Sequence, residues 1–408
     1  MARPKLRRLE RARLRRDDEQ LLVLRDPLEL CEPFAIDAIY EPVLDALDGQ
    51  RTLAQVRQSL LLRGIVAVEL DDLEDFVAEL GEAGLLDDDR FRELWASAHD
   101  EFVEQEIRAP RRAGLLYPED PESLRAWLAP ALPLVRASGP ASGAAEQALR
   151  YSPSPIAIVT PHQPPPSCAA SLRRLLGTLP EPEQYERVVI LATDHGPGLL
   201  PFAACDKDMG TPLGELAADL ATLATLDDRL PWLLREQVRL RSCDPLEWTV
   251  LLLRALWGDR CPPIVALACG QTRLTTQDGL AHARELVGTL RELLLEPTRA
   301  GKVLWWAAAE LSHRGPAYGH AELPDAARVE RDDRAMLQPL LDNQVEALAS
   351  AMMERPPEQR TSGGAALVTL AELLPENYRA TLIDYALLPT SGDAAGFVGA
   401  PFVRVDLG

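Results

Sequence analysis

Uninterrupted runs of apolar residues mark the second part of the chain, at residues 156–160, 187–192, 263–268 and 302–307. Such runs, rich in β-branched residues, are typical of strands that are buried on both faces of an α/β sheet. Between and after them, apolar residues at helical spacing predict helices at 168–177, 213–225, 229–239, 246–257, 277–295, 326–354 and 365–374. The alternation predicts an α/β domain over residues 156–408, with a mostly parallel sheet and helices on both faces. Two last strands, 379–387 and 396–406, follow each other directly and are expected to pair antiparallel.

Residues 17–108 show a different pattern, which predicts a small winged-helix-like α+β domain. A short strand at 21–24 and a helix at 35–47 precede Thr52, which can cap a helix that runs to Leu62 and stops at Gly64. A strand at 65–70, a helix through Leu80 and a charged helix at 91–107 complete the expected order. Asp and Glu crowd residues 71–89, and their repulsion by phosphate argues against DNA binding. A structural or docking module is the plainer interpretation.

Composition narrows the classes of function. The chain has 408 residues, 47% of them hydrophobic, and a formal net charge of −20, which argues against a general nucleic-acid binder. No apolar run is long enough to span a membrane, and the arginine-rich N-terminus lacks the apolar core of a secretory signal. That N-terminus is expected to be a solvated tail or a basic arm. The six cysteines have no disulfide-like spacing, which predicts reduced thiols in the cytoplasm.

A segment rich in Pro, Ala, Gly and Ser, residues 109–155, separates the two expected domains. It is predicted to be a linker with one helix at 122–132. The motif Ala113-Gly-Leu-Leu-Tyr-Pro118 lies near its start.

Histidines follow two of the predicted strands where each strand ends. His162 comes after the run 156–160, and His195 comes after 187–192, preceded by Asp194. Ligands of open α/β sheets bind outside the carboxyl ends of the strands, and the ends of adjacent parallel strands lie about 5 Å apart. A non-haem iron site needs two neutral imidazoles and a carboxylate, which Asp194 or Glu310 can supply. His313 can be a ligand, a partner that orients a ligand, or a general base.

Five motifs in this order resemble those of Memo proteins, called AmmeMemoRadiSam system protein B in bacteria. They are Pro161-His162, Thr193-Asp194-His195, Thr211-Pro-Leu-Gly214, Glu310-Leu-Ser-His-Arg-Gly315 and Ser391-Gly-Asp393 with Phe397-Val-Gly-Ala-Pro-Phe402. The segment 113–118 is similar to the opening motif of that family. Residues 309–319 resemble the form found in a subgroup that carries a PqqD-like domain in front, and residues 17–108 look like such a peptide-recognising domain.

The resemblance implies a fold similar to that of the LigB-type class III extradiol dioxygenases. It also implies metal ligands at His162 and His195, with a third proposed ligand at the position of Ser312. Members of the family include metal-binding proteins, proposed oxidants and peptide-binding scaffolds. Their bacterial genes associate with a radical-SAM protein, which makes that protein an expected partner.

The chain departs from the family pattern at three places. Cys243-Asp-Pro-Leu-Glu247 stands where the family has a Glu-His pair, so that only Leu246 and Glu247 match and Asp244 replaces the histidine. Gln163-Pro-Pro-Pro166 replaces the family's loop after His162. Ser312 offers an alcohol, which is a poor ligand for a soft metal. Cys243 is either a ligand with a lowered pKa or a small buried residue.

Two glycine-containing motifs have local interpretations. Thr211-Pro-Leu-Gly214 predicts the start of a helix, with Thr211 as its N-cap and proline at the first position. Gly363-Gly364 predicts a loop that needs positive φ.

These observations support two hypotheses. The first is a metal-dependent redox or oxygen-using protein that holds iron or copper at His162, His195 and Asp194, with His313 and Glu310 as catalytic groups. Asp244, Glu247, Ser312 and Cys243 are expected to line the same site. The second is a non-catalytic scaffold that binds a peptide or protein through the same cleft and the N-terminal domain.

Overall fold

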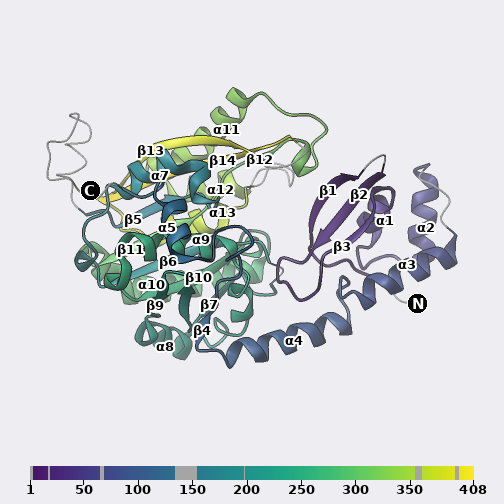
Figure 1. Ribbon diagram of the computed structural model, residues 1–408, viewed down its shortest axis with the longest axis horizontal. Coiled ribbons are helices and arrows are strands. Elements are labelled where there is room, and N and C mark those ends of the chain that lie inside the picture. The colour runs from purple at the N-terminus through teal and green to yellow at the C-terminus, as the bar shows by residue number, and fades with distance from the viewer. Residues whose placement is uncertain are drawn as a thin grey trace. The chain divides into compact units, whose positions relative to one another are not determined.

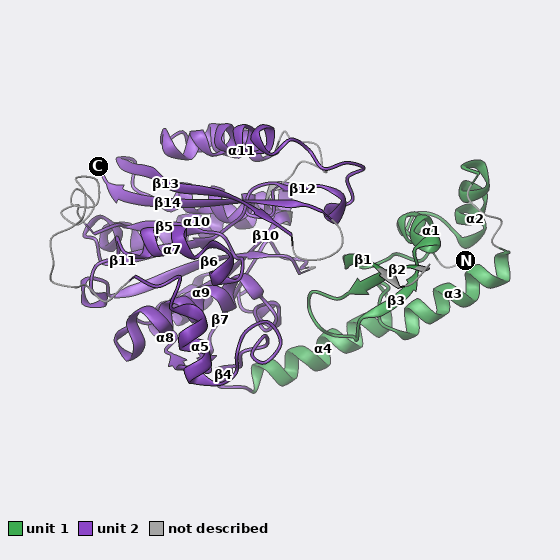
Figure 2. Cartoon of the chain, turned by 45° about the horizontal axis from the view of Figure 1, so that its top comes forward, with its two compact units in different colours: residues 1–104, 391–394 green, residues 105–390, 395–408 purple. Residues whose placement is uncertain are grey.

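The computed structural model describes residues 3–16, 19–64, 69–133, 154–196, 198–353, 361–390 and 395–408. The chain forms two compact units, residues 1–104 with 391–394 and residues 105–390 with 395–408, which Figure 2 colours separately. Each unit has its own hydrophobic core.

Unit 1 begins with a three-stranded antiparallel sheet made of β1 (Glu10–Arg16), β2 (Glu19–Arg25) and β3 (Phe34–Asp37). The expected solvated tail at the N-terminus is therefore wrong, because Glu10–Arg16 pair along their whole length with β2. The alternative of a basic segment that contacts acidic groups is confirmed in part by ion pairs from Arg11 to Asp45 and from Arg13 to Glu41. Lys5 and Leu6 also form isolated bridges, to Asp48 and Leu86. Leu22 and Leu24 of β2 are buried, whereas Ala12, Arg13 and Leu14 of β1 are exposed.

The helices of unit 1 follow the sheet. They are the 3₁₀ turn η1 (Ala38–Tyr40), α1 (Glu41–Ala46), α2 (Leu53–Leu62), α3 (Leu70–Glu82) and α4 (Asp89–Val103). The predicted cap is confirmed, since Thr52 accepts from the backbone of Gln55 and the Gln55 side chain accepts from Thr52 N. The helix expected at 35–47 begins only at Glu41, because residues 35–37 belong to β3. The strand expected at 65–70 falls mostly outside the described residues, and Leu70 already belongs to α3.

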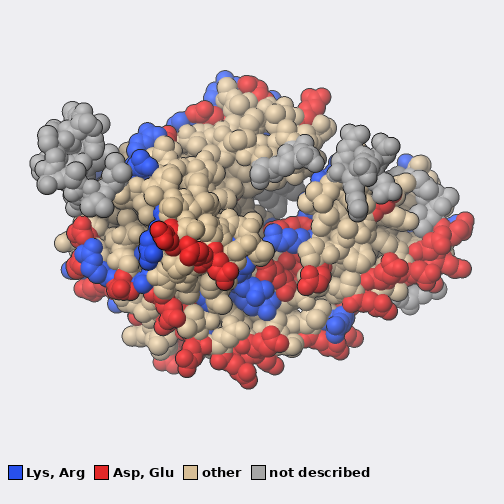
Figure 3. Space-filling model, viewed as in Figure 1, with Lys and Arg blue, Asp and Glu red and all other residues tan. Residues whose placement is uncertain are grey.

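The acidic segment of unit 1 has a clear amphipathic arrangement. On α3, Leu73, Val77 and Leu80 are buried, whereas Asp71, Asp72, Glu74, Asp75 and Glu79 are exposed. Acidic side chains are also more frequent than basic ones on the face of the molecule that Figure 3 shows. This distribution agrees with the expectation that a polyanion is a poor partner.

An eight-stranded sheet organises unit 2 (Figure 1). Its order is β12 (His313–Arg314), β14 (Phe397–Leu407), β5 (Ala157–Thr160), β11 (Val303–Ala308), β6 (Arg187–Asp194), β10 (Ile264–Gly270) and β7 (Phe202–Cys205), with β13 (Tyr378–Pro389) paired to β14. Strands β5, β11, β6 and β10 are parallel, and the strands outside them pair antiparallel. The predicted α/β class is confirmed, and the sheet is mixed around a parallel centre.

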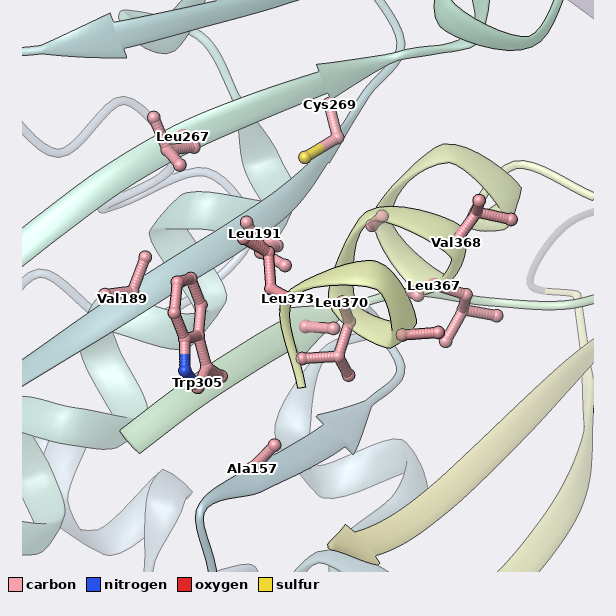
Figure 4. Close-up of a cluster of buried hydrophobic side chains, with 14 of the residues drawn as sticks. Ala157, Val189, Leu191, Leu267, Cys269, Trp305, Leu367, Val368, Leu370 and Leu373 are labelled. Atoms are coloured by element: carbon pink, nitrogen blue, oxygen red, sulfur yellow. The ribbon is translucent and has the colours of Figure 1, made fainter. Parts of the chain in front are cut away.

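Helices bury both faces of this centre. Val189 and Leu191 of β6 join a core cluster with Leu367 and Leu370 of α13 (Gly364–Leu373), which Figure 4 shows. The alternate residues of β6 are equally buried, on the face where α9 (Asp244–Trp257) contacts the strand. The other helices of unit 2 are α5 (Pro121–Leu128), α7 (Ala169–Leu176), α8 (Leu220–Arg229), α10 (Gln277–Arg299), α11 (Ala326–Leu341) and α12 (Val345–Met353).

Three predicted helices differ from the structure. Thr211 does not cap a helix, because it is the last residue of β8 (Asp208–Thr211). The chain turns at Pro212 and Leu213 and continues as β9 (Gly214–Leu216). The helix begins only at Leu220. Thr211 Oγ1 accepts from Leu213 N and donates to Gly214 O, which closes the turn. The segment 229–239 forms turns and a 3₁₀ helix, Gln237–Leu240. The helix expected at 326–354 breaks between α11 and α12, where Asn343 has φ 58°.

No helix within the described residues is both long and apolar enough to cross a membrane.

Candidate functional site

Three parallel strands of unit 2 end at one level and place polar residues beside one another. Ala308 of β11 pairs with Thr160 of β5 on one side and with Ala192 of β6 on the other. Strands β5 and β6 are therefore not adjacent, contrary to the expectation, because β11 lies between them. His162 and Glu310 each follow two residues after their strands, and His195 follows β6 directly.

The side chains of His313, Glu310, His162 and His195 meet in a row, which we call the His–Glu cluster. Glu310 Oε2 lies 3.1 Å from His313 Nε2 and 3.2 Å from His162 Nε2. His162 Nε2 lies in turn 3.1 Å from His195 Nε2, and the two rings meet edge to face with centroids 5.1 Å apart. The structure thus brings together four of the residues singled out in the sequence.

The His–Glu cluster has fewer hydrogen-bond donors than its close contacts require. His162 Nε2 has a single in-plane position, which either carries a proton or offers a lone pair. A lone pair would face the Glu310 carboxylate, and a proton must serve both Glu310 Oε2 and His195 Nε2. Within the described residues, Glu310 Oε2 and His162 Nδ1 are buried and make no hydrogen bond of normal geometry. The close approach of these nitrogen and oxygen atoms is thus only partly compensated by hydrogen bonds.

Burial and neighbouring charges set the ionisation of the two inner members. Burial lowers the pKa of His162, although the Glu310 carboxylate opposes this effect, so the imidazole is neutral near pH 7. Burial opposes ionisation of Glu310 as well, but His162, His313 and Gln163 together outweigh it and bring the pKa of Glu310 down to about 2. The cluster therefore contains one buried carboxylate beside the neutral imidazole of His162.

His313 is a partly exposed end of the cluster. Its side chain is 23% exposed, whereas the Glu310 side chain is fully buried. His313 Nδ1 lies 3.3 Å from Leu311 O, which leaves Nε2 to face Glu310. The ring of Tyr318 packs edge-on against His313 at 4.9 Å, and burial with the Glu310 charge raises the pKa of Tyr318 to about 12. A partly accessible imidazole beside a carboxylate can act as a general acid or base.

Hydrogen bonds from two segments fix Glu310. Its Oε1 accepts from His162 N at 3.1 Å and from Gln163 Nε2 at 2.9 Å, and its carbonyl accepts from Gly363 N at 3.0 Å. A Cβ on Gly363 would lie 2.5 Å from Glu310 O. The predicted positive φ at Gly363 is wrong, since its φ is −81°. Glycine is needed there because the backbone of Glu310 comes too close for a side chain.

Asp194 does not join the cluster, which corrects its expected role as a metal ligand. Its carboxylate forms a buried ion pair with Arg239 and accepts from Gly196 N at 2.7 Å. Glu236 binds the same guanidinium at 2.6 Å and accepts from the backbone of Leu199 and Leu200. Asp194 thus anchors the turn that carries His195.

Glu247 and Asp244 have partners elsewhere in unit 2. Glu247 accepts from Arg108 Nη2 at 2.9 Å, from the backbone N–H groups of Arg111 and Arg112, and from Tyr117 OH at 2.7 Å. Asp244 pairs with Arg112 at 2.6 Å. These contacts attach the segment 108–117 to α9, so both carboxylates, which were expected to line the site, have a structural role here.

The two remaining expected site residues are also buried outside the row. Cys243 Sγ lies 3.7 Å from Thr193 O, and burial raises the pKa of this thiol to about 12. Its interpretation as a small buried residue fits better than a thiolate ligand. Ser312 Oγ donates to Asp333 and not toward the His–Glu cluster.

Sequence reasoning missed Gln163, Tyr318, Gly363 and Asp333. Asp333 had a readable signal: it occupies the apolar face of α11 between Val329 and Leu337, at helical spacing. Gln163 and Gly363 act through contacts between distant segments, which no local pattern reveals.

The donor set of the cluster can be compared with what a metal needs. Two donors bonded at about 2.1 Å to one ion are about 3.0–3.4 Å apart, and the contacts of the row fall in this range. Nevertheless, no three His, Cys, Asp or Glu side chains in the described part of the chain surround one point as a metal ion requires. The residues fit a metal by donor type and pairwise spacing, but those described do not enclose one point as a complete three-ligand centre.

Known proteins resemble this chain over most of its length. Residues 108–400 match the family model for Memo-like protein. A MEMO1 family protein of Thermus thermophilus is 28% identical over 330 residues, which cover 80% of this chain and 91% of the relative. Another of Aquifex aeolicus is 22% identical over 238 residues, 58% of this chain and 60% of the relative. A solved structure of an uncharacterized Escherichia coli K12 protein covers 60% of this chain and 98% of its own, at 14% identity and a TM-score of 0.32.

Proposed function

Because the chain belongs to the Memo-like family, we propose that its His–Glu cluster is a metal site with redox or oxygen-using activity. The proposed ligands are His162, His195 and Glu310, and the proposed metal is iron or copper. One observation carries the proposal: a buried, ionised carboxylate oxygen lies 3.2 Å from the Nε2 of a neutral imidazole and makes no hydrogen bond of normal geometry within the described residues. A cation would compensate both groups.

The chemistry of the donors agrees with this choice of metal. Imidazoles suit iron and copper, and two histidines with one carboxylate leave coordination positions open. Such a bound metal supplies Lewis-acid or one-electron chemistry. The residues around it keep separate tasks: Gln163 and the backbone of His162 hold Glu310 in place, and the partly exposed His313 moves protons at its Nε2.

The test is metal content measured by mass spectrometry on untagged protein that has been purified anaerobically and then reconstituted with Fe(II) or Cu(II). The His162→Ala/His195→Ala double variant is compared with His282→Ala, which changes a histidine of α10 that packs on Trp232. We expect near-stoichiometric metal in the wild type and in His282→Ala, and none in the double variant. Wild-type protein that stays free of metal after reconstitution would exclude the metal site.

The alternative is a non-catalytic scaffold that binds a peptide or protein at the same place. The absence of a complete three-ligand centre among the described residues favours it, as does the use of Asp244 and Glu247 in structural ion pairs. A metal-free protein that binds a purified partner with unchanged affinity in the double variant would support this alternative.

The finer family assignment is also part of the proposal. We infer that the protein works in the cytoplasm in an AmmeMemoRadiSam-type system, that unit 2 is LigB-like, and that unit 1 is a PqqD-like, winged-helix-related domain that recognises a peptide or protein. Its compact sheet and helices and its acidic α3 are compatible with a docking role. Calorimetric titration of the full chain with the purified radical-SAM protein of the same system tests the partner; no heat of binding would argue against it.

A further inference from the structure

Another buried carboxylate, that of Asp333, contacts the segment between Glu310 and His313 and has no part in the function proposed above. Asp333 belongs to α11, far along the chain from the strand ends, and is fully buried. Burial raises the pKa of Asp333, and three hydrogen-bond donors partly offset this effect. An acidic residue on the apolar face of a helix carries a cost in stability unless its contacts compensate it.

The contacts of Asp333 converge on Ser312. Both Ser312 Oγ and Ser312 N donate to the carboxylate, the latter at 3.4 Å. Tyr385 OH of β13 donates to Asp333 Oδ2 at 2.7 Å. These donors occupy both carboxylate oxygens, and Ser312 is tied to the helix through its side chain and its backbone.

Strand β14 holds the same segment from its other side. Leu311 N donates to Gly399 O at 2.8 Å, and Gly399 N donates to Ser312 O at 2.9 Å. A Cβ on Gly399 would lie 1.8 Å from Asp333 Oδ2, so Gly399 is the residue that leaves room for the carboxylate. Leu311 and Ser312 are thus fixed between β14 and α11.

The fixed segment connects two members of the cluster, Glu310 and His313. Glu310 precedes it and His313 follows it, and their side chains meet at 3.1 Å. The His313 ring is also oriented by the carbonyl of Leu311, within the same segment. Any shift of Leu311 or Ser312 therefore changes the distance and angle between Glu310 Oε2 and His313 Nε2.

We propose that Asp333 is a positioning residue, which acts through Ser312 to set the geometry of Glu310 and His313. Ser312 then serves as a link between the segment and α11. This proposal rests on the proposed function for its consequence on metal binding. Its consequence for the His313 ring holds in the metal-free protein as well.

The experiment uses the full chain labelled with ¹⁵N-histidine, whose six histidines give a small set of ring signals. Signals are assigned through single substitutions and recorded without metal for the wild type, Ser312→Ala, Gly399→Ala, Asp333→Asn and Gly288→Ala. Gly288→Ala is the matched control, because no atom lies within 4 Å of its added Cβ. Unfolding midpoints and Co(II) affinity are measured on the same samples.

We expect Ser312→Ala and Gly399→Ala to move the His313 ring signals while those of His282 stay in place, and to weaken Co(II) binding by about 10- to 100-fold. Asp333→Asn should keep most of the wild-type behaviour. Its amide oxygen can accept from Ser312 N and Tyr385 OH, and its NH₂ group can donate to the Ser312 oxygen.

Unchanged His313 signals in both Ser312→Ala and Gly399→Ala would overturn the proposal, even if their unfolding midpoints fall, because a purely structural role predicts that combination. If the wild type binds neither Fe(II) nor Cu(II) on reconstitution but its His313 signals respond as expected, the proposed function fails and the positioning role stands. If a variant does not fold, Tyr385→Phe replaces it, since that change removes one donor from Asp333 and leaves the ring in place.

Discussion

Nε2 of His162 lies 3.1 Å from Nε2 of His195, although the strands that carry them are separated by β11. The two side chains reach across the end of the middle strand, and Glu310, which follows that strand, lies beside them. Glu310 follows β11, which lies between the strands that precede the two histidines. The position of its carboxylate beside them is therefore a consequence of the strand order. The same order decides how the cluster responds to pH and to substitution.

Glu310→Gln should change the pH dependence of stability. The pKa of Glu310 is lowered from 4.5 to about 2 in the folded protein, so its ionised form stabilises the fold above about pH 4.5, and this contribution is lost as the pH falls toward 2. We expect Glu310→Gln to be about 1–3 kcal/mol less stable than the wild type at pH 7, and this gap to close by pH 2. Urea unfolding at pH 7, 5 and 3 measures it.

The titration of His162 also lowers the stability of the fold as the pH falls. Its pKa is lowered on folding, so the unfolded chain takes up the proton first and stability declines as the pH falls below about 6.5. His162→Gln should flatten the wild-type curve between pH 7 and 5. A gap between wild type and Glu310→Gln that is constant from pH 7 to 3 would contradict the assigned ionisation of Glu310.

Gly363→Ala should destabilise the protein and disturb the cluster. The added Cβ would meet Glu310 O at 2.5 Å and Glu310 N at 2.6 Å, and backbone atoms cannot rotate away. We expect a loss of about 1–3 kcal/mol in the free energy of unfolding, with weaker Co(II) binding. Gly288→Ala in α10 is the control, and should be neutral or stabilising by about 0.5–1 kcal/mol. Equal stability of the two variants would argue against the close approach.

Glu247→Gln should lower stability without changing the cluster. The substitution places an NH₂ group against the Arg108 and Tyr117 donors and leaves the buried Arg108 guanidinium without its counter-charge. We expect the free energy of unfolding to fall by about 3–5 kcal/mol. Asp244→Asn is the comparison: its side chain is 31% exposed, so a loss of about 0–1 kcal/mol is expected. Denaturant unfolding measures both, and metal content of the folded variants should match the wild type. Loss of metal in folded Glu247→Gln would assign Glu247 to the site.

The thiols should be unreactive in the native protein at pH 8. Burial raises the pKa of Cys31 to about 11 and that of Cys168, Cys205, Cys243 and Cys261 to about 12, and it raises the pKa of Cys269 further. Since the thiolate is the reactive form, a chromogenic disulfide reagent should label native protein slowly and all six cysteines after denaturation. Rapid native labelling of Cys243 would show that its thiol is activated.

The apolar runs of the sequence determined the strands of the parallel centre and the α/β class. Every run expected at 156–160, 187–192, 263–268 and 302–307 is a strand, since short apolar runs rich in β-branched residues suit strands that are covered on both faces. The capping pattern at Thr52 was equally readable, since its partner is three residues away. Local patterns also selected His162, His195, Glu310 and His313 as polar residues at strand ends.

The tertiary structure decided which of these polar groups meet. Asp194 and Glu247 are as polar as Glu310, but Arg239 and Arg108 neutralise them, and those partners come from distant segments. Thr211 resembles a helix N-cap in sequence, but it lies at a hairpin turn because β8 and β9 pair antiparallel. The row from His313 to His195 depends on β11 lying between β5 and β6. Strand order arises from long-range packing, and residue spacing along the chain does not encode it.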